Sequence, residues 1–185
     1  MKFNLILSTF RNREGDAVRE FRDLIQENLG ENPLAEISDV RGVVIALTKT
    51  DPLEVIDLFK SMVTEEPWHF RYLLRVIPVE MVCSTNLTEI VVCACHLFQR
   101  VSKASSFKIL VERRFSNINS REVISAIASR ITNKVDLDDP DWVVVIEILG
   151  KKTGISVSRP EHLLSIVKEK MGFHRSSNID VNSID

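Results

Sequence analysis

Two cysteines and a histidine that lie close together in the sequence are the residues best suited to chemistry. Cys93, Cys95 and His96 have the side chains of a zinc site, or of a thiol nucleophile with its base. On a helix these positions point about 200° and then a further ~100° apart, so they do not converge. With Cys83 they form an odd set, which favours buried free thiols in a reducing compartment.

Four aspartates form a second candidate site. Asp136, Asp138, Asp139 and Asp141 could bind a cation or act as paired carboxylates in acid–base chemistry. The alternative is turn chemistry before a buried strand, in which aspartates accept hydrogen bonds from exposed backbone N–H groups, and we favour it. The six glycines are scattered and form no phosphate-binding loop. We therefore predict no metal, no cofactor and no catalytic residue.

Basic residues on rigid elements form the third candidate site, and such residues are suited to binding a polyanion. Arginine pairs well with phosphate oxygens, and exposed Phe115 beside Arg114 offers a stacking face for an unpaired base. The alternative is that these residues form a solvated, charged surface that binds no ligand. The residues predicted to bind RNA are Lys108, Arg113, Arg114, Arg121, Arg130, Lys134, Lys151, Lys152 and Arg159.

The charge of the chain is divided unevenly along its length. Its formal net charge is only -2 at pH 7. Residues 1–99 carry 10 Lys and Arg against 15 Asp and Glu, whereas residues 100–175 carry 14 against 9. Such an asymmetry hints at a basic functional surface in the second half.

The elements that would position these residues follow a regular order. The first half reads strand, helix, strand, strand, helix, strand, which is the order of the ferredoxin-like split unit. The apolar stripe of Val18, Phe21 and Ile25 marks its first helix, and Asp51 with Pro52 opens its second. The expected strands are Phe3 to Phe10, Leu34 to Ile37, Val43 to Leu47 and Tyr72 to Val79.

The second half repeats the mixture of helices and strands, so the fold class is α+β. A helix from Asn86 to about Val101 is apolar almost all round and is expected to be buried. The remaining elements are a strand at Phe107 to Arg114, a helix at Asn119 to Ile131, strands at Trp142 to Leu149 and Ile155 to Ser158, and a short helix from Pro160. No apolar run approaches the ~20 residues of a membrane span, and we expect a cytoplasmic protein.

Several runs in this half resemble a THUMP domain. They are Phe107-Lys-Ile-Leu-Val-Glu-Arg-Arg, Ser120-Arg-Glu-Val-Ile-Ser-Ala-Ile-Ala, Lys134-Val-Asp-Leu-Asp-Asp-Pro-Asp, Val144-Val-Ile-Glu-Ile-Leu-Gly and Gly154-Ile-Ser-Val. The resemblance covers about Arg71 to Pro160. It implies a ferredoxin-like domain at residues 1–80 packed on a THUMP domain at 81–172, and we expect a disordered tail at 173–185.

The resemblance also implies a function. THUMP proteins bind tRNA, with the paired domains holding the acceptor stem and the single-stranded 3′ end. Most relatives carry a fused catalytic domain, whereas this chain most resembles the stand-alone type. Those proteins are non-catalytic adaptors that present tRNA to a separate modifying enzyme, an RNA cytidine acetyltransferase that forms N4-acetylcytidine.

Two other classes of function stay open from the residues alone. In the first, the basic face of a protein-interaction scaffold docks an acidic partner and never touches RNA. In the second, an enzyme uses Cys95 and His96.

Overall fold

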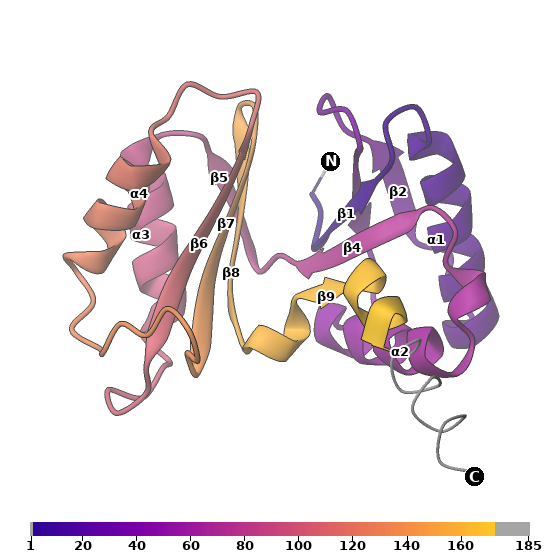
Figure 1. Ribbon diagram of the computed structural model, residues 1–185. Helices are drawn as coiled ribbons and strands as arrows, with labels where there is room; N and C mark the ends of the chain where they lie inside the picture. The colour runs from indigo at the N-terminus through magenta and orange to yellow at the C-terminus, as the bar shows by residue number, and fades with distance from the viewer. Residues whose placement is uncertain (1, 173–185) are drawn as a thin grey trace, which may run out of the picture. The chain divides into compact units, whose positions relative to one another are not determined.

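The computed structural model describes residues 2–172, which form two units with separate sheets and cores (Figure 1). The N-terminal unit comprises Leu5–Ile77 and the chain from Leu164 onward. The C-terminal unit comprises Pro78–Leu163 together with the first residues up to Asn4. The predicted tail at 173–185 lies outside the described residues.

The N-terminal unit is ferredoxin-like, as its element order predicts. Its sheet has the strand order β2-β3-β1-β4-β9, and β3 pairs antiparallel with both β1 and β2. The elements are β1 (Leu5–Thr9), α1 (Glu14–Leu29), β2 (Leu34–Ile37), β3 (Val43–Leu47), α2 (Pro52–Glu65), the 3-10 helix η1 (Pro67–His69), β4 (Leu73–Pro78) and β9 (Leu164–Ser165).

Local signals in the sequence fix the ends of these helices. The Asp51 carboxylate accepts a hydrogen bond from the backbone N–H of Leu53 at the start of α2, where Pro52 is the first helical residue. Gly30 ends α1 in the left-handed conformation (φ 64°), and its N–H donates to the Gln26 carbonyl. The Asp51 cap agrees with the predicted start of the second helix.

The core of the N-terminal unit lies between its sheet and its two long helices. Phe59 of α2 contacts the rings of Phe21 and Phe70 edge to face, with centroid distances of 6.0 and 5.4 Å. The Glu20 carboxylate of α1 accepts hydrogen bonds from the backbone N–H groups of residues 71, 72 and 73. This carboxylate therefore fixes the chain between η1 and β4 against α1.

The C-terminal unit is a four-stranded sheet with two helices on one face (Figure 1). The strand order is β5-β8-β7-β6, in which β6 and β7 are parallel and the other pairs are antiparallel. Its elements are β5 (Met81–Ser84), α3 (Leu87–Phe98), β6 (Phe107–Arg114), α4 (Ser120–Ala128), β7 (Trp142–Leu149), β8 (Lys152–Ser158) and the 3-10 helix η2 (Pro160–His162).

Three features of the second half differ from the sequence prediction. The strand β5 was not expected, because it is short and forms only by pairing with β8. The helix α3 is not buried all round, since Val92 is 54% exposed and His96 is exposed. The predicted helix from Pro160 is wrong at its start, where a 3-10 turn leads into β9, and residues 166–172 are helical instead.

The chain from Leu164 onward joins the N-terminal sheet, although the predicted boundaries group it with residues 81–172. Strand β9 pairs antiparallel with β4, and Leu164 and Ile166 are each 1% exposed within the N-terminal core. The Lys170 amino group donates to the Phe70 carbonyl (2.5 Å). The burial of these apolar side chains decides where the segment belongs.

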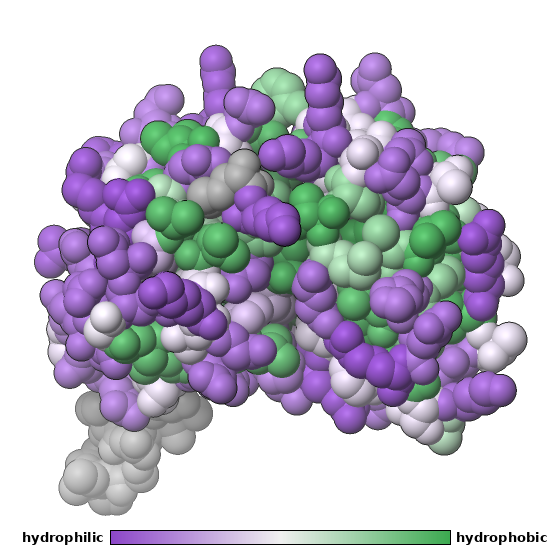
Figure 2. Space-filling model, turned by 180° about the vertical axis from the view of Figure 1, so that it is seen from behind, coloured by the Kyte–Doolittle hydropathy of each residue, from purple (hydrophilic) through white to green (hydrophobic). Residues whose placement is uncertain are grey.

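The surface is mainly hydrophilic on the side opposite to Figure 1, with apolar patches among the polar residues (Figure 2). Across residues 2–172, no helix combines the length and the apolar character needed to cross a membrane.

Candidate nucleic-acid interface

One end of the C-terminal sheet collects several loops and two helix starts. The parallel register of β6 and β7 aligns Arg114 with Leu149, so both strands end at the same edge. The chain leaves β6 there to enter α4, and leaves β7 there through the tight Gly150–Lys151 turn into β8. Strand β5 also ends there, since Ser84 pairs with Lys152, and α3 begins shortly after it. We call this end of the unit the basic edge.

The predicted RNA-binding residues separate into two groups. Those at the basic edge are Arg113, Arg114, Arg121, Lys151 and Lys152. Those at the opposite end, near the start of β6, the end of α4 and the acidic turn, are Lys108, Arg130, Lys134 and Arg159. The structure therefore does not gather the nine side chains into one cradle.

The two neighbouring arginines of β6 point to opposite faces of the sheet. Arg113 lies on the helix-covered face, and its guanidinium donates to the carbonyls of Ser116 (3.1 Å) and Ile118 (3.4 Å). Arg114 lies on the other face and pairs with the Glu147 carboxylate at 2.8 Å. Because Glu147 is 1% exposed, Arg114 neutralises a buried charge and is not free to bind phosphate.

Sequence reasoning missed Glu147 as the partner of Arg114. The residue interrupts the apolar strand β7, which is otherwise Val, Ile and Leu after Trp142. A lone carboxylate inside such a strand demands a cationic partner, and this signal was available in the sequence.

Besides Arg113, the exposed cations of the basic edge are Arg121, Lys151 and Lys152. None of the three has a recorded ion pair within residues 2–172. Arg121 lies in the first turn of α4, where the Asn119 side chain accepts its backbone N–H at 2.9 Å. Free N–H groups at a helix start favour anions, so this position suits a phosphate.

Phe115 directly follows β6 at this end of the unit, next to Gly150 of the β7–β8 turn, and has an unusual conformation. Its backbone adopts φ 53°, a region that aromatic residues rarely occupy, and the side chain is 73% exposed. The N–H of Gly150 donates to the Arg114 carbonyl at 2.9 Å, which joins the loop that follows β6 to the turn that follows β7. An exposed aromatic ring held in a strained turn is typical of a functional position.

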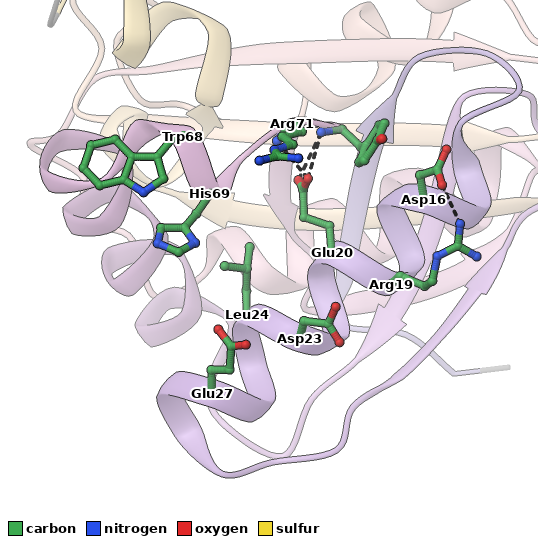
Figure 3. A pocket seen from close by; sticks show the side chains of 10 residues that line it. Asp16, Arg19, Glu20, Asp23, Leu24, Glu27, Trp68, His69 and Arg71 are labelled. Atoms are coloured by element: carbon green, nitrogen blue, oxygen red, sulfur yellow. Dashed lines mark hydrogen bonds and ion pairs between the residues drawn. The ribbon is translucent and has the colours of Figure 1, made fainter.

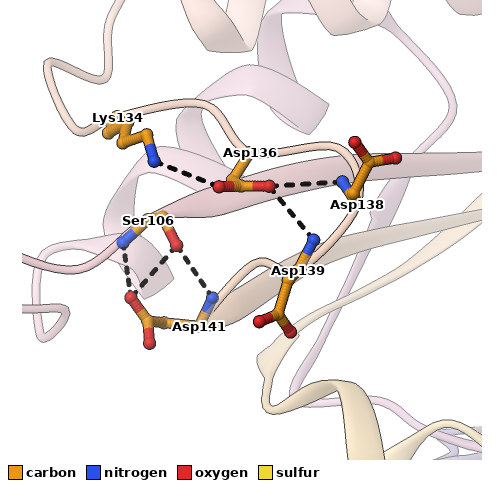
Figure 4. A network of polar contacts seen from close by, with 6 residues as sticks. All are labelled: Ser106, Lys134, Asp136, Asp138, Asp139 and Asp141. Atoms are coloured by element: carbon orange, nitrogen blue, oxygen red, sulfur yellow. Dashed lines mark hydrogen bonds and ion pairs between the residues drawn. The ribbon is translucent and has the colours of Figure 1, made fainter.

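The opposite end of the unit carries the acidic turn (Figure 4). Asp136 accepts hydrogen bonds from the backbone N–H groups of Asp139 (3.0 Å) and Asp138 (3.3 Å) and pairs with Lys134 at 3.1 Å. Asp141 accepts the backbone N–H (2.8 Å) and the hydroxyl (3.1 Å) of Ser106. These contacts are the turn chemistry that the sequence favours.

Electrostatics at this turn oppose both phosphate binding and general-acid catalysis. Backbone N–H donors, that of Asp139 foremost for Asp136 and that of Ser106 for Asp141, hold the pKa of both carboxyls below the usual 3.8. Both groups are therefore ionised near neutral pH. The Arg159 guanidinium nearby stacks on Trp142 at 4.3 Å from the ring centroid and donates to the Asp141 carbonyl (3.1 Å).

The cysteines are free and half-buried beside the C-terminal core. Burial foremost, and then the neighbouring Cys93, raises the pKa of Cys83 to about 12. Burial also raises the pKa of Cys95. Because the thiolate is the reactive form, these thiols are poor nucleophiles at neutral pH. Within residues 2–172, no group of three His, Cys, Asp or Glu side chains is placed to hold a metal ion.

The fold and the basic edge together define an α+β protein with a ferredoxin-like unit and a second unit whose loops present cations around an aromatic ring. Residues 84–158 match the family model described as THUMP domain. These residues therefore form a THUMP domain, as the sequence resemblance predicts.

Several known proteins are similar to parts of this chain. The THUMP domain-containing protein 1 homolog of Drosophila melanogaster is 29% identical over 87 residues, which are 43% of this chain and 27% of that protein. PH1313 of Pyrococcus horikoshii has a TM-score of 0.61 at 19% identity, over 85% of this chain and 55% of that one. A 4-thiouridine synthetase in complex with RNA and ATP has a TM-score of 0.54 at 12% identity, over 85% and 42%.

These similarities cover only part of each known protein. The chain spans about a quarter of the length of the fly protein and about half of the two solved chains. The two structures share the fold of both units with this chain, since the matched segments cover most of it.

Proposed function

We propose that this chain is a cytoplasmic, non-catalytic adaptor that binds tRNA at the basic edge and presents it to a separate tRNA-modifying enzyme, a cytidine N4-acetyltransferase. The observation that carries the proposal is the exposed Phe115 ring at the same end of the C-terminal unit as Arg121, Lys151 and Lys152, which form no ion pair within residues 2–172. A cationic edge with an aromatic platform suits a single strand, because phosphates meet the charges and a base stacks on the ring.

The proposed position of the tRNA follows from the same chemistry. An unpaired base is available at the single-stranded 3′ end, whereas the bases of the acceptor stem are already stacked. We therefore assign the 3′ end to Phe115 and its phosphates to the lysines of the β7–β8 turn and the start of α4. The match of residues 84–158 to the THUMP domain model supports the RNA-binding part of this proposal.

Binding of bulk tRNA to the purified chain, measured by filter binding at several salt concentrations, tests the RNA-binding part. Affinity should fall steeply as salt rises, because each neutralised phosphate releases counterion. Replacing Lys151 and Lys152 with alanine should weaken binding and reduce the slope of log K against log salt by roughly 1 to 2.

The matched control is Lys103→Ala with Arg130→Ala, which removes two exposed cations from the other end of the same unit. This variant should bind tRNA like the wild type. Equal losses in both variants, or a binding constant that is insensitive to salt, would refute the basic edge as the RNA site. Capture of an acidic protein by a chain that binds no tRNA would favour the scaffold function instead.

The adaptor part of the proposal has to be tested in the native host. Deleting the gene should lower N4-acetylcytidine in bulk tRNA, measured by mass spectrometry of nucleosides, and the Lys151→Ala/Lys152→Ala variant should fail to restore it. Loss of a different modified nucleoside would keep the adaptor role and replace the partner enzyme.

A further inference from the structure

A second surface lies in the N-terminal unit, between α1 and the η1 segment. It is a pocket of about 510 Å³ (Figure 3). Asp23 and Glu27 of α1 line this pocket together with Trp68 and His69, and Leu24 lies between His69 and Glu27 (Figure 3). Sequence reasoning missed this pocket, because no local pattern brings residues 23–27 beside residues 68 and 69.

Trp68 is not needed for packing. Its side chain is 62% exposed, while the neighbouring Phe70 is 2% exposed and fills the core. The backbone beside the ring is nevertheless well fixed, since Glu20 holds the following residues and His69 Nε2 lies 2.9 Å from Glu66 Oε2. Large aromatic rings held in solvent on fixed backbone are typical of binding surfaces.

Asp23 and Glu27, two carboxylates of the pocket lining, form no ion pair and no side-chain hydrogen bond within residues 2–172. Asp23 and Glu27 are four residues apart on one face of α1, where like charges repel. By contrast, Asp16 is paired with Arg13 and Arg19 at the other end of the pocket.

Arg71 also lines the pocket, on the side beside Glu20 and away from Glu27 (Figure 3). The whole lining nevertheless contains four carboxylates, those of Asp16, Glu20, Asp23 and Glu27, against two guanidinium groups. This charge repels a phosphate backbone and attracts a cation.

We propose that this pocket receives an arginine or lysine side chain from an exposed segment of a partner protein. Asp23 and Glu27 would meet the cationic head, and the Trp68 ring would lie against it in a cation–π contact. Leu24 would contact the methylene stem, as apolar surface does with long basic side chains. The surface is separate from the basic edge, so one chain can bind RNA and a basic protein segment by opposite charges.

The test uses the two tryptophans of the chain as position markers. Their indole N–H signals in a ¹⁵N correlation spectrum are assigned with a Trp142→Phe variant. Titration with the acetylated, amidated peptide Gly-Arg-Gly-Arg-Gly should shift the Trp68 signal and leave the Trp142 signal unchanged. The same peptide with citrulline in place of arginine has no charge and should give no shift.

Substitutions separate the charges from the fold. Asp23→Asn with Glu27→Gln should weaken peptide binding by about fivefold, from two partly exposed ion pairs. Glu54→Gln with Asp57→Asn removes two exposed carboxylates from α2 and should leave peptide binding unchanged. Thermal unfolding of both variants checks that the fold is intact.

Three results would overturn the pocket as a site for basic segments. They are an unshifted Trp68 signal at millimolar peptide, an equal shift with the citrulline peptide, and unchanged affinity in the Asp23→Asn/Glu27→Gln variant. Loss of bulk tRNA binding in that variant would also count against it, because the pocket would then belong to the RNA surface. Failure of the wild-type chain to bind tRNA would refute the proposed function alone.

Discussion

At the scale of single residues, Phe115 shows what a sequence can and cannot reveal. Its place beside Arg114 suggests a stacking face, but its left-handed backbone depends on where β6 stops and how the next loop crosses Gly150. That strain, on the order of 1 kcal/mol or more, is tolerated because the surrounding contacts fix the turn.

Replacing Phe115 with asparagine should separate stability from binding. Asparagine accepts the left-handed conformation, so the free energy of unfolding should stay within about 0.5 kcal/mol of the wild type or rise. Affinity for bulk tRNA should fall by roughly tenfold, because one stacked base contributes ~1–3 kcal/mol. Urea unfolding and filter binding measure the two quantities.

Leu137 supplies the control for this substitution. Its side chain is 72% exposed, against 73% for Phe115, and it lies in the acidic turn at the other end of the unit. Leu137→Asn should leave tRNA affinity unchanged. If Phe115→Asn binds tRNA as tightly as the wild type, the ring does not stack on a base.

Arg113 and Arg114 look equivalent in the sequence, but strand alternation sends them to opposite faces. Arg114→Ala removes the guanidinium that faces the buried Glu147 and should lower the free energy of unfolding by roughly 3 kcal/mol. Arg113→Ala removes two exposed contacts to carbonyls and should cost about 1 kcal/mol or less.

Urea unfolding of both single variants tests this difference. Similar losses in the two variants would show that the pair between Arg114 and Glu147 contributes little. The unfolding data are also needed to interpret the RNA-binding assay. Weaker tRNA binding by Arg114→Ala would reflect a destabilised sheet as well as a lost charge.

At the scale of elements, the prediction succeeded where the signals are local. The bounds of β6 and β7 and the caps of α2 and α3 follow from apolar runs and from Asp51 and Asn86. The strands β5 and β9 have four and two residues and exist only through pairing with distant strands. Nothing within such short segments selects an extended structure over a loop.

The acidic turn that leads into β7 should make stability depend on pH. The pKa of Asp141 is lowered in the folded state, chiefly by the backbone N–H of Ser106, so the ionised form favours folding. That contribution is present above the unfolded-state pKa and is lost as pH falls through the folded-state pKa. Asp141→Asn should therefore be less stable than the wild type near pH 6, and the difference should shrink as pH falls below about 4.

Chemical denaturation of the two proteins at several pH values between about 6 and 3 measures this difference. Glu65, an exposed carboxylate on α2, gives a control, since Glu65→Gln should show the pH dependence of the wild type. A constant gap between Asp141→Asn and the wild type across the range would show that the hydrogen bonds to Ser106 do not depend on the charge.

At the scale of the whole molecule, composition located the basic half but not the basic edge. The sequence shows an excess of cations after residue 99, yet five of the nine predicted residues lie at one end of the C-terminal unit and four at the other. The two groups are separated because β6 and β7 are parallel and in register. Strands that pair across ~35 residues of sequence give no local sequence pattern from which this pairing could be predicted. The candidate site is therefore smaller than the predicted one.

The last described segment of the chain, which begins at Leu164, packs in the core of the N-terminal unit. Leu164 is buried among residues of α1, α2 and β4, so Leu164→Ala should leave a cavity and lower stability by roughly 2–4 kcal/mol. Hydrogen exchange should accelerate in β1 and β4 before it does in β6 and β7. Val157→Ala, which opens a cavity in the C-terminal core, should reverse that order. Faster exchange in β6 and β7 for Leu164→Ala would show that its burial supports the C-terminal unit, because a cavity first weakens the contacts that surround it.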